Sequence, residues 1–204
     1  MSGIGNISIF AGLKEDELQA IEALAQTRHM GRGSVVIQEG DSSSSLYLLL
    51  DGRVKVYVSD SEGKEFILDT LEPGDYFGEL SLLDEEERSA SVMATEKCSF
   101  SVIRRQDFVE LLQTYPSIGQ KLVVNLVQRI RILNESVKSL ALKDVYGRIK
   151  DLLDRLCVNE ENGCSVSDRL TQQDIANRVG SSREMVARIL KDLVSGSYIR
   201  IEKK

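Results

Sequence analysis

Short apolar runs separated by turn residues dominate the first half of the chain. Val54, Val56 and Val58 alternate with Lys55 and Tyr57, which is typical of a strand with one buried and one wet face. Similar apolar runs cover residues 35–37, 46–50, 66–68 and 100–103, with turn residues at 40–41, 51–52, 61–63 and 73–75. Regular turns between short strands predict an antiparallel barrel or jelly roll.

Helical periodicity flanks this strand-rich region. Leu18, Ile21 and Leu24 repeat at a helical spacing and predict a short opening helix. Residues 106–112 form a second short helical pattern, and Pro116 stands where a new helix can begin, because a first-turn N–H has no partner inside the helix. From residue 117 to 142 the pattern is continuously helical.

The long helical segment carries a heptad repeat. β-Branched residues at position a with leucine at position d favour a parallel two-stranded coiled coil. The a positions are Val123, Ile130 and Val137, and the d positions are Leu126, Leu133 and Leu140. Arg129 then falls at g and Asn134 at e. We therefore expect a homodimer; the alternative is an amphipathic helix packed on its own domain.

The last third predicts two short helices joined by a glycine turn. Residues 145–156 resume helical spacing, and 159–163 form a polar turn. Thr171 and Asp174 are spaced as a near capping box, and Gly180 can take the left-handed conformation that ends a helix. Ser181 or Ser182 then caps a second helix with a basic outer face. This arrangement is a helix-turn-helix.

The predicted fold class is therefore α+β with three parts. Residues 1–115 form an N-terminal β-roll, residues 116–142 a coiled-coil dimerisation helix, and residues 143–204 a helix-turn-helix DNA-binding domain. The segment 142–144 is the expected hinge, and because it lacks Pro and Gly it could be a bend in a nearly continuous helix.

Charge is distributed unevenly along the chain. The net charge of −6, taken for the chain as a whole, disfavours a nucleic-acid partner. However, residues 1–141 carry 14 Lys and Arg against 22 Asp and Glu, a net −8, whereas residues 142–204 carry 12 against 10, a net +2. This asymmetry suits a molecule in which only the C-terminal part approaches phosphates.

Other classes of protein are disfavoured by what the sequence lacks. No apolar run is long enough to span a bilayer, and the N-terminus lacks the pattern of a signal peptide, so we expect a cytoplasmic protein without a membrane partner. Cys98, Cys157 and Cys164 have no metal-binding spacing and are expected to be reduced. With His29 as the single histidine, we predict no metal site, no catalytic residues and no enzyme.

A candidate anion cradle lies between residues 74 and 92. A guanidinium at Arg88 beside the Ser89 hydroxyl, facing a glycine turn across a short excursion, can offer an anion a bidentate fork and close backbone N–H groups. Glu79 accepts hydrogen bonds only, which suits the hydroxyls of a ribose. The alternative is a solvated surface hairpin whose acidic residues 84–87 contribute little.

A second candidate site is the outer face of the last helix. Arg183 and Arg188 can each fork onto guanine, and Glu184 can accept from cytosine N4. Lys191 shares this face, while Thr171, Gln173, Ser181 and Ser182 would contact phosphates. Glu184 and Arg188 could instead form only a surface ion pair, and Glu184 could complete a capping box with Ser181.

Both motifs resemble those of the catabolite activator (CRP/FNR) family of bacterial transcription regulators. Gly78-Glu79-Leu80 and Arg88-Ser89-Ala90 are similar to the family's phosphate-binding cassette, and residues 180–188 are similar to its recognition helix. The resemblance implies a cyclic-nucleotide-binding β-roll, a winged helix-turn-helix, and a homodimer that binds a palindromic double-stranded operator and RNA polymerase. It implies no permanent cofactor, and a cyclic nucleotide effector, cAMP first and cGMP second.

Two departures from the family pattern stand out. In the family, the residues matching Leu133 and Asn134 lie near the nucleotide base and typically carry hydroxyls, so Leu133 leaves the base open between adenine and guanine. An alternative is a regulator with an empty pocket or another effector, such as a cyclic dinucleotide. The family's wing is also represented only by residues 197–201, so the wing is either naturally short or shortened here.

Overall fold

The computed structural model describes residues 3–160, 163–166 and 170–201, and the side chains of residues 159, 160, 163 and 164 are not considered. The chain forms two compact units. Unit 1 comprises Met1–Val58 and Ile67–Ile130. Unit 2 comprises Ser59–Phe66 and Arg131–Lys204, so the tip of one hairpin of the roll belongs to the second unit.

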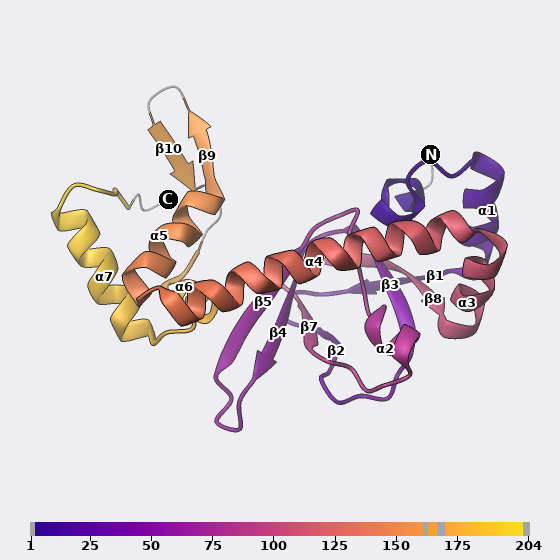
Figure 1. Cartoon of the computed structure of the whole chain (residues 1–204), viewed down its shortest axis with the longest axis horizontal. Helices are drawn as coiled ribbons and strands as arrows, with labels where there is room; N and C mark the ends of the chain where they lie inside the picture. Colours follow the sequence, from indigo (N-terminus) through magenta and orange to yellow (C-terminus); the bar gives the residue numbers. More distant parts are fainter. Residues whose placement is uncertain (1–2, 161–162, 167–169, 202–204) are drawn as a thin grey trace. The chain divides into compact units, whose positions relative to one another are not determined.

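Unit 1 is built around two four-stranded antiparallel sheets (Figure 1). One sheet has the order β1-β8-β3-β6, with β1 at Gln26–Met30, β8 at Cys98–Arg104, β3 at Ser45–Asp51 and β6 at Tyr76–Phe77. The other has the order β2-β7-β4-β5, with β2 at Val35–Ile37, β7 at Ser91–Ala94, β4 at Val54–Ser59 and β5 at Glu65–Leu71. The predicted β-roll is confirmed.

The strands of unit 1 that the apolar pattern missed are β1, β6 and β7, of which β1 is polar and β6 is very short. β1 has the sequence Gln-Thr-Arg-His-Met and is mostly exposed, so its sequence shows no alternation of apolar and polar residues. β6 has only two residues. Both exist because backbone groups of β8 and β3 pair with them, which is a non-local cause that no local pattern can reveal.

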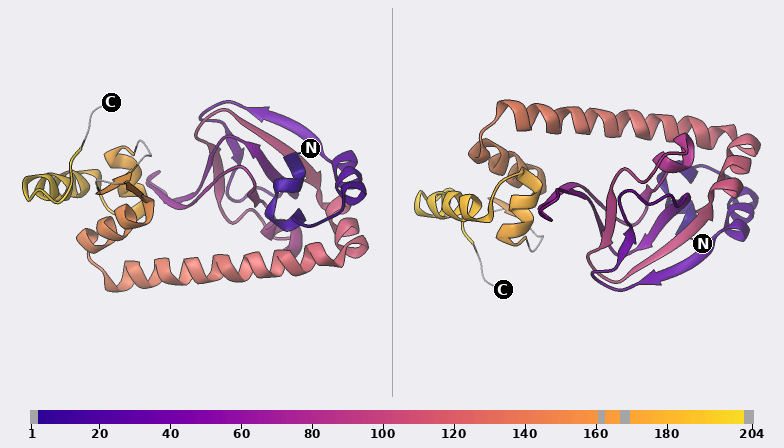
Figure 2. Two further views of the ribbon diagram at one scale, coloured as in Figure 1. Left: turned by 90° about the horizontal axis from the view of Figure 1, so that it is seen from above. Right: turned by 90° about the horizontal axis from the view of Figure 1, so that it is seen from below.

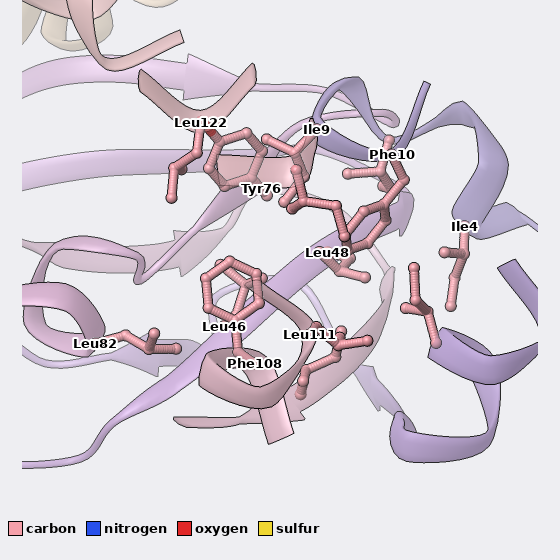
Figure 3. Close-up of a cluster of buried hydrophobic side chains, with 14 residues drawn as sticks. Ile4, Ile9, Phe10, Leu46, Leu48, Tyr76, Leu82, Phe108, Leu111 and Leu122 are labelled. Carbon is pink, nitrogen blue, oxygen red and sulfur yellow. The ribbon is translucent and has the colours of Figure 1, made fainter. Parts of the chain in front are cut away.

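The core of unit 1 lies between the first sheet and the helices beside it (Figure 3). The N-terminus contributes the 3-10 turns η1 (Gly3–Asn6) and η2 (Ser8–Phe10) and helix α1 (Glu15–Leu24). Leu46 and Leu48 of β3 meet Phe108 of α3 (Arg105–Thr114) and Leu82 of α2 (Leu80–Asp84) in one buried cluster. This cluster therefore connects the sheet to the short helix that follows Gly78.

A second cluster fills the space between the two sheets. Its aromatic centre is Tyr47 stacked on Phe77 with ring centroids 5.1 Å apart, and both rings meet Phe100 edge to face. Aromatic pairs in these geometries are favourable beyond their area burial. Phe77, the residue before Gly78, is thus fixed in the core.

Helix α4 runs unbroken from Pro116 to Leu142, and Figure 2 shows it as one continuous helix. Ile118 and Leu122 are buried and Leu126 packs beside them on the core of unit 1. Leu126 is therefore half-buried against its own domain, and its assignment to the heptad seam stays a prediction.

The exposed face of α4 has a different register. Val123, Val127, Ile130, Asn134 and Val137 are spaced alternately four and three residues apart, so they share one side of the helix, and all five are exposed. In this register Asn134 lies within the apolar stripe rather than beside it.

Unit 2 contains the predicted helix-turn-helix. α5 spans Val145–Leu156, α6 spans Gln172–Val179 and α7 spans Arg183–Ser195, and they share one buried cluster. The predicted polar turn at 159–163 falls in a hairpin of β9 (Cys157–Glu160) and β10 (Gly163–Val166), with residues 161–162 outside the described part. Among the described residues after Ser195, none forms a strand.

Two smaller expectations concern the hinge and the cysteines. Between α4 and α5 the Asp144 carboxylate accepts from the Gly147 N–H at 2.8 Å, so a new helix starts with its own cap rather than as a bend.

Cys98 is a free, buried thiol, but Cys157 takes part in a disulfide, so the expectation of reduced thiols was wrong for Cys157.

The part of the chain that the structure describes holds no helix with the length and apolarity needed to cross a bilayer. The same residues contain no cluster of three or more His, Cys, Asp or Glu side chains arranged to bind a metal.

Candidate functional site

The predicted cradle is a turn, a short helix and an acidic loop. β6 ends at Phe77, Gly78 has φ +84°, and Glu79 is the N-cap residue of α2. α2 ends at Glu85, which adopts the left-handed conformation with φ +65°. The chain then returns through the acidic residues to Arg88, so both cassette segments lie at one edge of the roll.

Arg88 is buried at 4% exposure and points at the glycine turn. Its Nη1 donates to the Gly78 carbonyl at 2.7 Å, and its Nη2 donates to the Ser45 carbonyl at 2.9 Å. Its Nε makes a longer contact of 3.4 Å with the Ser43 hydroxyl. The guanidinium is therefore held in place from two segments that are far apart in sequence.

Glycine at position 78 is a geometric requirement of this arrangement. A Cβ added there would lie 2.6 Å from Arg88 Nη1 and 2.7 Å from the Ser45 carbonyl oxygen. Both distances are far below van der Waals contact, and the positive φ favours glycine as well. The turn and the guanidinium therefore occupy one tightly shared space.

Arg88 retains capacity for an anion. A guanidinium has five N–H donors, and the three contacts above use three, which leaves two for a fork. Among the ion pairs of the described residues, none involves Arg88. Burial lowers the pKa of Arg88, while the nearby Tyr47, Glu79 and Asp41 raise it. A buried cation held mainly by neutral carbonyls gains stability from a bound anion.

Glu79 is also buried, at 2% exposure, and is held from α4. Arg129 Nη1 lies 2.5 Å from Glu79 Oε1, and Arg129 Nη2 donates to the Tyr76 carbonyl at 2.8 Å. The guanidinium also lies over the Tyr76 ring at 5.0 Å, a cation–π geometry. Burial raises the pKa of Tyr76, so its hydroxyl stays neutral. Arg129 thus joins α4 to the carboxylate of the cradle.

The remaining predicted ligand residues are placed as follows. Leu80 is 44% exposed, Ser89 is exposed and Ala90 is half-buried beside Arg88 in the chain. Leu133 and Asn134 are exposed on α4 and belong to unit 2. The structure therefore brings together Gly78, Glu79, Arg88 and Arg129 through direct contacts.

Sequence reasoning missed the serine segment that supports Arg88. The pattern of the serines at 42–45 indicates no more than a loop, yet Ser43 supplies a hydroxyl and Ser45 a carbonyl to the guanidinium. A backbone carbonyl has no side-chain signature. Only the pairing of Ser45 with Arg104 at the start of β3 places it there.

The helix-turn-helix is capped as its sequence predicts. The Thr171 hydroxyl accepts from the Asp174 N–H at 3.1 Å, and Asp174 Oδ2 accepts from the Thr171 N–H at 2.8 Å, which completes a capping box. Gly180 ends α6 with φ +63°. The Ser182 hydroxyl accepts from the Met185 N–H at 3.2 Å, so Ser182, not Ser181, caps α7.

The predicted DNA-contacting side chains share the solvent side of this motif. Val186, Ile189, Leu190 and Leu193 of α7 are buried. The side chains that are exposed are Thr171, Gln173, Ser182, Arg183, Glu184, Arg188 and Lys191, while Ser181 is half-buried. Gln173 donates to Asn177 at 2.8 Å. A basic helix face with one carboxylate is thus presented to solvent.

Glu184 is ionised at neutral pH. Hydrogen bonds from its own backbone N–H and from Ser182 hold the pKa of its carboxyl below the usual value, and Arg183 adds to this effect. Its stabilising effect on α7 is therefore present above the unfolded-state pKa and is lost only as pH falls through the lower folded-state pKa. No ion pair joins Glu184 to Arg188 among the described residues, so the carboxylate can accept from a base.

Comparison with protein families gives two matches along the chain. Residues 27–115 match the cyclic nucleotide-binding domain, and residues 147–204 match the Crp-like helix-turn-helix domain. These ranges contain the cradle and the capped helix pair, respectively.

Individual proteins with similarity span most of the chain. The cAMP-activated global transcriptional regulator CRP of Escherichia coli O6:H1 is 38% identical over 172 residues, covering 81% of each protein. A CRP-like cAMP-activated global transcriptional regulator of Mycobacterium tuberculosis is 31% identical over 205 residues, covering 98% of this chain and 92% of that protein.

Solved structures agree with these matches. The c-di-GMP-responsive global regulator CLP of Xanthomonas campestris superposes with a TM-score of 0.82 at 25% identity, covering 94% of this chain and 97% of that chain. The Thermus thermophilus catabolite activator protein has a TM-score of 0.61 at 30% identity, covering 96% and 91%.

The close approach at Gly78 leads to a first prediction. Gly78→Ala should lower the free energy of unfolding of unit 1 by more than Gly33→Ala, as measured by urea denaturation. Gly33 is the matched control because it also lies in unit 1, its φ is +82° and a Cβ there meets nothing within 4 Å. The control should lose about 1–2 kcal/mol from the left-handed conformation alone, and Gly78→Ala about 1–3 kcal/mol more from overpacking. Equal losses of stability in the two variants would contradict the close approach of position 78 to the Arg88 guanidinium.

Proposed function

Because the chain belongs to the CRP/FNR family of transcription regulators, we propose that it is a homodimer whose binding to a palindromic operator is controlled by a cyclic nucleotide. The effector proposed first is cAMP. Its 3′,5′-phosphate would sit against Arg88 and Ser89, and its ribose 2′-hydroxyl would donate to Glu79. The role is regulatory rather than catalytic, as it is in the named relatives.

The observation that carries this proposal is the buried Arg88 guanidinium with two donors still available. A purely structural arginine at 4% exposure would ordinarily be paired with a carboxylate. Here the neighbouring carboxylate, Glu79, is bound by Arg129 instead. A cation and a carboxylate held apart in this way suit a ligand with an anionic phosphate and an adjacent hydroxyl.

The identity of the effector has two supported candidates. The relatives from Escherichia coli and Mycobacterium tuberculosis are described as cAMP-activated, which supports cAMP. The Xanthomonas campestris regulator is described as c-di-GMP responsive and superposes well on this chain. Leu133, where the family typically has a hydroxyl, favours this second candidate or a different base such as that of cGMP.

The dimer is proposed to form through the exposed face of α4. An apolar stripe with a 3–4 spacing is the geometry that buries one helix against a copy of itself. Asn134 interrupts this stripe, and a single polar residue at a seam position specifies register and a two-stranded state at a cost in stability. The parallel pairing expected from the sequence is retained, with the register shifted to Val123, Val127, Ile130, Asn134 and Val137.

Regulation would act through the dimer arrangement. A ligand can shift an equilibrium only by its differential affinity for two states. Because Arg129 joins Glu79 to α4, filling the cradle changes the contacts of the helix that carries the proposed seam. The favoured arrangement would set two recognition helices about 34 Å apart, one helical turn of DNA. RNA polymerase is proposed as a partner from the family resemblance alone.

Removing the guanidinium tests the cradle. Arg88→Leu should abolish cAMP binding in isothermal titration calorimetry, with a loss of at least about 100-fold, because a charge-assisted fork to phosphate disappears. Arg88→Lys should bind with intermediate affinity, since it keeps the charge but not the fork. Circular dichroism should show that both variants remain folded. Unchanged affinity in Arg88→Leu would overturn the cradle.

A thermal-shift screen with cAMP, cGMP and c-di-GMP identifies the effector in the same preparation. A ligand at 100 times its Kd adds about 2.7 kcal/mol of stability. Stabilisation by cAMP supports the first candidate and stabilisation by c-di-GMP alone supports the second. No response to any of the three would contradict cyclic-nucleotide control.

Base reading by α7 leads to a prediction about specificity. Glu184→Ala should relax discrimination at one operator base pair by about 1–3 kcal/mol, measured with a panel of single-base operator variants in fluorescence anisotropy. The control Lys191→Ala should weaken binding to all operator sequences alike. It should also reduce the slope of log K against log salt concentration by about one, as expected for the loss of a phosphate contact. A loss in Glu184→Ala that is equal on every sequence would contradict direct reading.

The α4 face leads to a prediction about oligomeric state. Ile130→Glu should shift the protein towards the monomer in sedimentation velocity, because the dimer would bury two opposed carboxylates. Ile132→Glu is the matched control: Ile132 is 58% exposed against 56% for Ile130, but residues two apart do not share a helix face. A dimer that survives Ile130→Glu, or dissociates only with Ile132→Glu, would contradict the proposed face.

A further inference from the structure

Helix α2 is too short to be stable by itself. It has five residues, far below the length at which an isolated helix persists in water. Leu82 is its fully buried hydrophobic anchor and reaches towards Phe108 in Figure 3, whereas Leu80 and Leu83 are 44% and 41% exposed. The position of Glu79, the residue that starts this helix, therefore depends on contacts made by the rest of α2.

Arg105, the first residue of α3, supplies two of those contacts and a third contact to the serine segment. Its Nε donates to the Leu82 carbonyl at 3.1 Å, and its Nη2 forms an ion pair with Glu85. Its backbone N–H donates to the Ser44 carbonyl at 3.3 Å. One residue thus connects the C-terminal end of α2 to the serine segment at 43–45.

These two segments are the ones that surround Arg88. The serine segment provides Ser43 and Ser45 to the guanidinium, and the turn before α2 provides the Gly78 carbonyl. We infer that Arg105 is a positioning residue of the cradle, which holds α2 against the serine segment and so sets Glu79 relative to Arg88. This inference rests on the proposed function, in which Glu79 takes the ribose 2′-hydroxyl.

The two side-chain contacts of Arg105 differ in strength. The ion pair joins side chains that are 36% and 71% exposed, so water screens it and it contributes little. The bond to the Leu82 carbonyl is stronger, because a charged donor satisfies one of the end carbonyls that a helix leaves unpaired and complements the negative end of its dipole. Loss of the guanidinium should therefore matter more than loss of the Glu85 charge.

Four variants of the full chain separate these contributions. Arg105→Ala removes both side-chain contacts, Arg105→Lys keeps the charge without the fork, and Glu85→Gln removes only the ion pair. Arg104→Ala is the control, because Arg104 is the adjacent arginine and is exposed. The probes are cAMP and 2′-deoxy-cAMP, titrated by calorimetry, together with hydrogen exchange of the α2 amides in the ligand-free protein.

Arg105→Ala should lower cAMP affinity roughly tenfold, the equivalent of one charge-assisted bond. The loss for 2′-deoxy-cAMP should be much smaller, because that ligand cannot use the carboxylate that Arg105 positions. Glu85→Gln should change affinity less than about threefold, Arg105→Lys should recover part of the loss, and Arg104→Ala should match the wild type. The α2 amides should exchange faster in Arg105→Ala alone.

Two results would overturn the inference. One is wild-type exchange of α2 in Arg105→Ala, which would show that the contacts do not hold the helix. The other is an equal loss for both ligands, which would indicate general destabilisation rather than positioning of Glu79. A wild-type protein that binds neither ligand would refute cAMP as the effector, and the exchange measurement would then decide the role of Arg105 by itself.

Discussion

A buried guanidinium held by two backbone carbonyls is the interaction on which the cradle depends. Arg88 is covered by the roll and bonded to Gly78 and Ser45, and both bonds require that position 78 has no Cβ. Neutral carbonyls satisfy part of its donors but do not neutralise its charge. Arg88 therefore stays a buried positive charge without an ion pair among the described residues, and the proposed ligand, an anion with an adjacent hydroxyl, would neutralise it.

Among the described residues, no carboxylate forms an ion pair with Arg88. Glu79 is the nearest candidate counter-ion, yet its carboxylate is bound by Arg129 of α4 at 2.5 Å. Arg129 thereby performs two tasks, because it separates Glu79 from Arg88 and it joins the cradle to the long helix. On α4, Ile118, Leu122 and Leu126 face the core of unit 1, so the opposite stripe stays available for a second copy.

Charge is organised at two scales in this molecule. Residues 1–141 are strongly acidic overall, with a net −8, which disfavours nonspecific contact with the phosphate backbone of DNA. A small anion can still bind there, because a local guanidinium fork acts over a few ångströms whereas the acidic surface is screened by salt. The exposed Arg183, Arg188 and Lys191 of α7 present the opposite charge where the family matches its DNA-reading helix.

The sequence alone determined the fold class, the bounds of the long helix, the helix-turn-helix and the cassette residues Gly78, Glu79 and Arg88. These features depend on local patterns: alternation, capping residues, a proline at a helix start, and glycine turns at fixed spacing. Tertiary structure decided what depends on distant backbone. The strands β1 and β6 exist by pairing with β8 and β3, Ser45 and Ser43 reach Arg88 only because the roll folds them beside it, and Leu126 is half-buried because it packs on the core of unit 1. A heptad pattern records which residues are apolar, but only the packed core decides which apolar face of a helix is already occupied.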